Sequence, residues 1–217
     1  RSSLTECLLC DGSDGLGGAI AVEGSGTLTV NASRLSNNQA NGAGGAIALY
    51  GGSATILNST IDGNFTPGFG GAIWMNEGTT LTLSDSLVVT NTAGYANAGV
   101  GGGLYNRGTA TIERTTFRAN QANDAGALHT TGAGSALTVR QSTFSANDAF
   151  ASGGALQLFG GVVLLENSTV SGNTAHNVAG GIRLATPGGG GATLLHHVTL
   201  FNNVVTNFDN VTSNSNL

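Results

Sequence analysis

Apolar and polar residues alternate along most of this chain, in short runs separated by glycine, asparagine and serine. The segments TLTV (27–30), ATIL (54–57), LTLS (81–84) and TATIE (109–113) place an apolar residue at every second position. Such alternation is typical of a β-strand with one buried face. Each run is too short to bury a face alone, so the pattern predicts an all-β protein whose core comes from stacking.

Two motifs recur in phase with these runs. A small-residue pair followed by an apolar residue begins at Gly17, Gly44, Gly70, Gly101, Ala125, Gly153 and Ala179, a spacing of about 27 residues. An apolar residue followed three positions later by asparagine recurs as Leu35/Asn38, Ile61/Asn64, Val88/Asn91, Phe117/Asn120, Phe144/Asn147, Val170/Asn173 and Leu200/Asn203. The repeats predict a right-handed parallel β-helix of about seven coils, each with three short strands. We expect an N-terminal cap over 1–16, the β-helix over 17–203 and a C-terminal tail or cap over 204–217.

Alignment of the repeats assigns positions to the inside or outside of the coils. Ser33, Ser59, Ser86, Thr115, Ser142 and Ser168 form one inward column, which we interpret as hydroxyls bonded to backbone at a corner. The repeated asparagines predict a second ladder at a turn, where asparagine tolerates left-handed backbone. Outside, the alignment stacks Arg140 between Glu113 and Glu166 and puts Arg114 beside Asp85, so we expect exposed ion pairs.

The paired GGAI-like and apolar-x-x-Asn motifs resemble the repeats of polymorphic outer-membrane proteins and autotransporter passengers. The resemblance covers residues 17–203. It implies a right-handed parallel β-helix on a bacterial surface, without an activity, since this fold also hosts polysaccharide lyases and hydrolases.

Large and polar residues gather on the outward positions that follow the glycine pairs. A stacking core does not require exposed rings, so this face predicts a binding surface for carbohydrate or for a cell-surface protein. The alternative is that the rings pack beneath the longer loops, such as 92–100. The predicted binding residues are Tyr50, Trp74, Asn76, Tyr95, Tyr105, Arg107, His129, Gln157, Phe159 and Arg183.

An enzyme of the lyase or glycosidase type is the first alternative function. It needs acidic side chains gathered on one face. Asp124 and Asp148 are the best available pair, because both end an AND segment, and His129 is the nearest base. Turn chemistry explains Asn-Asp at these positions without catalysis.

Ice binding is the second alternative function. The pairs Thr27/Thr29, Ser53/Thr55, Thr80/Thr82, Thr109/Thr111 and Ala136/Thr138 form an outward array that resembles the threonine faces of β-solenoid ice-binding proteins. The array ends at Val162/Leu164 and Ala192/Leu194. Threonine is also a favoured strand residue.

Composition and charge limit the classes of partner that this protein could bind. The chain has 40% apolar and 9% charged residues, a net charge of -5 and no lysine, which argues against both disorder and nucleic-acid binding. No apolar run is long enough for membrane insertion, and the composition favours an extracellular or cell-surface protein. Cys7 and Cys10 suit a local disulfide or free thiols better than half of a zinc site, so no metal or cofactor is implied. Open solenoid ends leave end-to-end self-association or continuation in a longer chain as possibilities.

Overall fold

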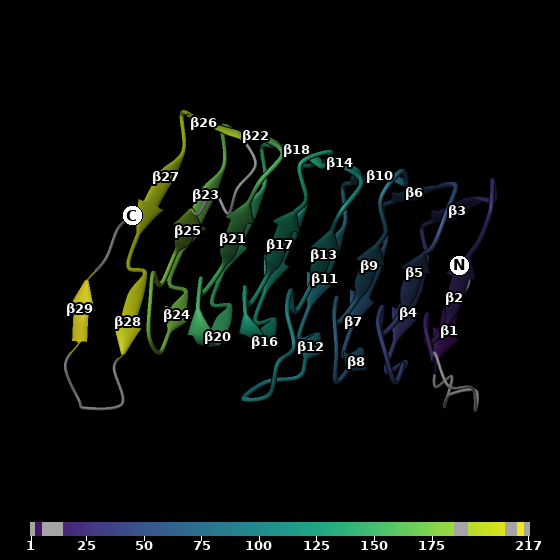
Figure 1. Ribbon diagram of the computed structural model, residues 1–217, viewed down its shortest axis with the longest axis horizontal. Helices are drawn as coiled ribbons and strands as arrows, with labels where there is room; N and C mark the ends of the chain where they lie inside the picture. The colour runs from purple at the N-terminus through teal and green to yellow at the C-terminus, as the bar shows by residue number, and fades with distance from the viewer. Residues whose placement is uncertain (1–2, 6–14, 185–190, 207–211, 215–217) are drawn as a thin grey trace.

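The computed structural model describes residues 3–5, 15–184, 191–206 and 212–214, with backbone alone for the first and last of these segments. Its strands form stacked coils along the long axis of the molecule, with the N-terminal coil at one end and the C-terminal coil at the other (Figure 1). Within the described residues no helix is long and apolar enough to cross a membrane. Cys7 and Cys10 lie outside the described residues.

Each full coil contributes one strand to each of four sheets, which we number in chain order from the glycine pair. Sheet 1 follows the glycine pair and contains β2 (Ile20–Val22), β5 (Ile47–Leu49), β9 (Ile73–Met75), β13 (Leu104–Asn106), β17 (Leu128–Thr131), β21 (Leu156–Phe159) and β25 (Ile182–Leu184). Sheet 2 contains β3 (Thr27–Asn31), β6 (Ser53–Leu57), β10 (Thr80–Ser84), β14 (Thr109–Glu113), β18 (Ala136–Arg140), β22 (Val162–Glu166) and β26 (Ala192–His196).

Sheet 3 lies between the two ladders and contains β1 (Ser3–Thr5), β4 (Arg34–Ser36), β7 (Thr60–Asp62), β11 (Leu87–Val89), β15 (Thr116–Arg118), β19 (Thr143–Ser145), β23 (Thr169–Ser171) and β27 (Thr199–Phe201). Sheet 4 contains β8 (Phe65–Thr66), β12 (Thr92–Ala93), β16 (Gln121–Asp124), β20 (Asp148–Ser152), β24 (Thr174–Ala175), β28 (Val204–Thr206) and β29 (Thr212–Asn214). The all-β parallel solenoid is confirmed, and each coil from β5 onward has a fourth strand where three were predicted. This strand is as short as two residues, as in β8 and β12, so it carries no readable alternation. In the first coil only an isolated bridge from Gln39 to Phe65 occupies this position.

Strand pairing extends into both predicted end segments, 1–16 and 204–217. β1 pairs in parallel with β4, so sheet 3 extends into the predicted N-terminal cap. At the other end β28 continues sheet 4, and β29 folds back on it as an antiparallel strand. The solenoid pairing therefore runs beyond 17–203 in both directions.

The core is one continuous stack of inward side chains. Phe117 and Phe144 are fully buried, and their rings stack with centroids 5.1 Å apart and planes 16° apart. Apolar residues of sheets 1, 2 and 3 fill the remaining layers, among them Ile73, Leu83 and Val88. Alternate residues of each strand are thus buried because the coils stack on one another, as predicted.

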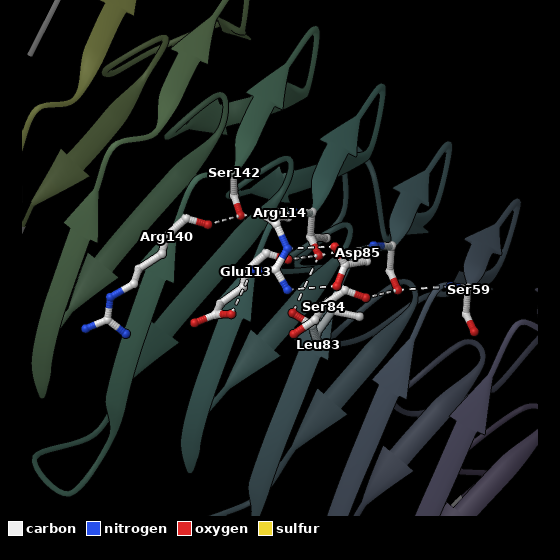
Figure 2. Close-up of polar contacts among 10 residues, drawn as sticks. Ser59, Leu83, Ser84, Asp85, Glu113, Arg114, Arg140 and Ser142 are labelled. Carbon is white, nitrogen blue, oxygen red and sulfur yellow. Dashed lines mark hydrogen bonds and ion pairs between the residues drawn. The ribbon is translucent and has the colours of Figure 1, made fainter.

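Both predicted ladders are present. The backbone N–H and the Nδ2 of Asn91 each donate to Oδ1 of Asn120 at 3.0 Å. In the other ladder the Ser59 N–H donates to the Ser86 hydroxyl oxygen at 3.1 Å, and that hydroxyl donates to the Ser84 carbonyl at 2.7 Å (Figure 2). These ladder side chains thereby find hydrogen-bond partners in their own coil or in an adjacent one.

The left-handed residue at the asparagine corner was predicted wrongly. It is the residue before the ladder asparagine that has positive φ, namely Asn37, Gly63, Thr90, Ala119, Ala146, Gly172 and Asn202. The ladder asparagine itself must keep a conformation that aims its amide along the stack, so the turn is made one position earlier.

The predicted ion pairs confirm the register outside the coils. Arg114 donates to both oxygens of Asp85, with Nε–Oδ1 2.7 Å and Nη2–Oδ2 2.8 Å (Figure 2). Arg140 Nε lies 3.0 Å from Glu166 Oε2, and Arg140 is also in register with Glu113. Exposed ion pairs of this kind contribute little to the free energy of unfolding. Their geometry agrees with the predicted register of the repeats.

Candidate functional site

The outer face of sheet 1 assembles the predicted column of binding residues. Pairing of β9, β13, β17, β21 and β25 places neighbours in the order Trp74, Tyr105, His129, Gln157 and Arg183. Inward residues alternate with them, since Ile73 and Met75 on either side of Trp74 are fully buried. The glycine-pair repeat therefore supplies a rigid strand whose central side chain points outward.

A hollow of ≈ 450 Å³ opens at the Trp74 end of this column. Trp74 and Tyr50 line it with their rings 5.1 Å apart and tilted by 59°. The full lining is Gly15, Leu16, Asn41, Gly42, Ala43, Tyr50, Phe69 and Trp74. None of these side chains is charged, so the hollow presents rings, small apolar groups and one amide.

Tyr105 continues the aromatic surface away from the hollow. Its ring lies 5.0 Å from Phe69 and stacks on His129 at 5.1 Å, with planes 20° apart. Burial raises the pKa of Tyr105, and the smaller effect of Arg107 lowers it. The hydroxyl therefore stays protonated at neutral pH, when it can both donate and accept hydrogen bonds.

His129 and Gln157 were predicted as exposed contacts, and the structure buries both. Their exposed fractions are 6% and 3%. The imidazole packs between Tyr105 and the ring of Phe159, whose centroid is 5.5 Å away. Gln157 Nε2 donates to Asp124 Oδ1 at 3.3 Å. These two side chains form the floor of the face instead of its surface.

The burial of His129 also changes its chemistry. Burial lowers the pKa of His129 to about 4, although a hydrogen bond with Gln157 acts in the opposite direction. Its Nδ1 has no hydrogen-bond partner among the described residues. The ring is therefore neutral at pH 7 and inaccessible, which does not suit the proton-transfer role considered for it.

We expect the stability of the fold to depend on His129 between pH 6.5 and 4. In this window the unfolded chain binds a proton at the ring and the folded chain does not, so the free energy of unfolding falls as the pH falls. The expected loss is about 2–3 kcal/mol for a shift from 6.5 to about 4.

Urea unfolding at several pH values measures this loss. The matched variant is His129→Gln, because Gln157 occupies the next position in the column. The variant should show a flatter dependence on pH over the same window. Equal slopes for the two proteins would contradict the assignment.

Arg183 and Phe159 form the far end of the face. The Arg183 guanidinium carbon lies 5.1 Å from the centroid of Phe159. Its Nη1 is 3.9 Å from Asp124 Oδ1, which is too long for a hydrogen bond. Both side chains are partly exposed.

Two predicted contacts lie in the turn between sheets 1 and 2. Arg107 forms an ion pair with Glu77 of the preceding coil. The Asn76 backbone N–H donates to the Leu49 carbonyl at 2.9 Å, and its carbonyl accepts from the Thr79 hydroxyl at 2.7 Å. Asn76 therefore helps to build the turn, and its side chain is half-buried.

Tyr95 belongs to a different cluster, over sheet 4. Its hydroxyl donates to Asp148 Oδ2 at 2.8 Å and lies 3.3 Å from His176 Nε2. Its ring meets Phe150 edge-on at 5.6 Å. Burial and the bond to Asp148 raise the pKa of Tyr95 to about 12. Tyr95 thus anchors its loop, in agreement with the alternative that some rings pack beneath loops.

The structure separates the two aspartates that were predicted as a pair. Asp148 is in register with Gln121, and Asp124 is in register with Ser152. Both aspartates end an AND segment, but Asn147 is a ladder residue that pairs with Asn120, whereas Asn123 lies three residues beyond the ladder. Asp148 instead faces His176, and Asp124 faces Gln157 and Arg183. No group of three metal-ligand side chains occurs within the described residues.

The threonine array on sheet 2 keeps its register over five coils. Thr29, Thr55, Thr82, Thr111 and Thr138 are neighbours in successive strands. The next two residues in this column are Leu164 and Leu194, and Leu194 is 60% exposed. The outward direction is as predicted, and the array ends in an apolar strip.

The hollow was the main feature that sequence reasoning missed. Gly15, Leu16 and Asn41 come from segments ahead of the glycine pairs, where the repeats are least alike. Asn41-Gly42, a turn-favouring pair one residue ahead of the glycine pair at Gly44, was the available signal.

Comparison with known proteins supports the architecture. A family model described as a right handed beta helix region matches residues 9–216. No curated protein and no solved structure matched the chain. The narrower resemblance to bacterial surface-protein repeats stays a prediction. Because the family model covers nearly the whole chain, this protein belongs to the right-handed β-helix family.

Proposed function

We propose that this protein is an extracellular or cell-surface binding module that holds carbohydrate in the hollow beside Trp74. The observation that carries the proposal is the uncharged hollow of ≈ 450 Å³ walled by the tilted rings of Tyr50 and Trp74. Its volume lies within the range of small-molecule sites. The rest of the β-helix holds these rings at fixed positions.

The chemistry of the lining suits a sugar ring. The CH face of a pyranose packs on aromatic rings, and its hydroxyls need hydrogen-bonding groups at the edge. Asn41 is exposed at this edge and offers both a donor and an acceptor. Phe69 is 41% exposed. Exposed apolar surface is unfavourable in water, and a bound sugar ring would cover it.

The alternative functions have less structural support. The two aspartates considered for catalysis hold different partners, and the threonine array gives way to Leu164 and Leu194. A protein partner would also suit exposed rings. A concave lining without charge favours a small ring over a broad protein surface, so a protein ligand is an outcome of the test below.

We expect Trp74→Ala to weaken carbohydrate binding at least about tenfold, because aromatic anchors in pockets carry a large share of binding energy. The measurement is a glycan array followed by titration of the glycans that bind. The matched control is Phe201→Ala, which removes an exposed ring from sheet 3, far along the stack. That variant should bind as the unaltered protein does.

Two results would overturn the proposal. One is a folded protein that binds no glycan, or that binds only a protein. The other is glycan binding that Trp74→Ala leaves unchanged while its circular dichroism stays native.

A further inference from the structure

Planar side chains continue without a break from the hollow to the far end of sheet 1. We call Phe69, Tyr105, His129, Phe159 and Arg183 the planar track. Successive centroids are 5.0, 5.1 and 5.5 Å apart from Phe69 to Phe159, and the Arg183 guanidinium follows at 5.1 Å. The track runs parallel to the axis of the solenoid, because each member belongs to a later coil.

Only part of the track is accessible. His129 is buried beneath its neighbours, whereas Tyr105, Phe159 and Arg183 are partly exposed. A ligand on this face would therefore meet Tyr105, Phe159 and Arg183 in turn after leaving the hollow. The buried imidazole keeps the two rings on either side of it in place.

Arg183 differs from most arginines of this protein. Arg34, Arg107, Arg114 and Arg140 each hydrogen-bond a carboxylate. The Arg183 side chain makes no hydrogen bond within the part of the chain that the structure describes, and its nearest carboxylate oxygen is 3.9 Å away. Its N–H groups are thus available to a ligand, and its guanidinium carbon lies 5.1 Å from the Phe159 ring centroid.

The carboxylate of Asp124 determines which ligand groups suit the surface beside Arg183. Its carboxylate balances the charge of the guanidinium and accepts hydrogen bonds, while Arg183 donates them. A donor beside an acceptor suits the hydroxyl groups of an uncharged sugar, which take both roles. The net charge of -5 also disfavours a polyanionic ligand.

We propose that the carbohydrate is an uncharged, extended glycan chain that lies along the solenoid axis, with one sugar ring in the hollow at Trp74 and a later ring at the Arg183–Asp124 pair. This inference rests on the proposed function. Trp74 and Arg183 are four strand steps apart, a span of about 19 Å at the strand spacing of a sheet. A pyranose unit in an extended chain occupies about one strand spacing, so a chain of about five units is needed to place rings at both ends.

Chain length tests the proposal directly. The probes are neutral oligosaccharides of glucose, mannose, galactose and xylose, each in lengths of two, four and six units. We expect affinity in the binding series to rise at least about tenfold between two and six units, as a second subsite is engaged. Equal affinity for these two lengths would overturn the extended mode.

Arg183→Gln separates the two ends. It should lower the affinity of the six-unit probe at least about fivefold and leave the two-unit probe unchanged, since only the longer chain reaches it. Arg118→Gln, at an exposed position on sheet 3, is the matched control and should change neither. If Trp74→Ala removes binding at all lengths while Arg183→Gln removes none, the extended mode fails and the proposed function stands. If no neutral series binds, the extended neutral-glycan mode fails, and the glycan array decides the proposed function separately.

Discussion

Replacing Asn120 by alanine is expected to lower the free energy of unfolding by about 3–5 kcal/mol, because buried groups left without partners cost about 1–3 kcal/mol each. Asn120 is fully buried. Its Oδ1 accepts from the backbone and side chain of Asn91, and its Nδ2 donates to the Val88 carbonyl and to Asn147. Removal of one amide therefore leaves unpaired groups on two neighbouring coils.

Urea unfolding followed by circular dichroism measures this loss, and hydrogen exchange at the Asn91 amide locates it. The control is Asn97→Ala, which truncates an exposed asparagine in a loop and should change stability by less than about 0.5 kcal/mol. A similar small effect for both variants would mean that the ladder does not hold adjacent coils together.

The second large effect is expected at Gly71, the second residue of a glycine pair. A Cβ there would lie 2.2 Å from the Gly102 carbonyl oxygen and 2.7 Å from the Thr92 carbonyl carbon. Both are backbone atoms, Gly102 in the next coil and Thr92 in the last strand of the same coil, so they can yield only if the stack itself deforms. We expect Gly71→Ala to cost at least about 3 kcal/mol or to prevent folding.

Gly134→Ala provides the comparison. Nothing lies within 4 Å of a Cβ built there, and the residue does not have positive φ. Thermal unfolding should show a Tm close to that of the unaltered protein for this variant and a large decrease for Gly71→Ala. A Gly71→Ala protein with an unchanged Tm would contradict the close coil contact at this corner.

Repetition is why so much of the fold could be predicted from sequence. Alignment of two motifs placed Arg114 beside Asp85 and Ser59 beside Ser86, and the structure joins both pairs. The fourth strand escaped because β8 and β12 have two residues each, too few to show a period. The two positions of the glycine pair also differ in a way that the motif alone did not indicate. Alanine is accepted at the first position, where Ala125 adopts positive φ, whereas the second position is always glycine.

The site was predicted less completely, because alternation gives the direction of a side chain and not its depth. Trp74 and Tyr105 are neighbours as predicted, but His129 between Tyr105 and Phe159 is covered by those rings. Tyr95 binds Asp148, 53 residues further along the chain, and no repeat motif encodes that contact. The hollow likewise depends on the shapes of three successive coils.

Trp74 is the only tryptophan of the protein, and it lines the hollow. Its intrinsic fluorescence is therefore the most direct report on the proposed site. Titration with a glycan that the array identifies should change the intensity or wavelength of emission saturably, with the same Kd that calorimetry gives. Calorimetric binding of that glycan with no change in Trp74 emission would place the carbohydrate elsewhere and contradict the account.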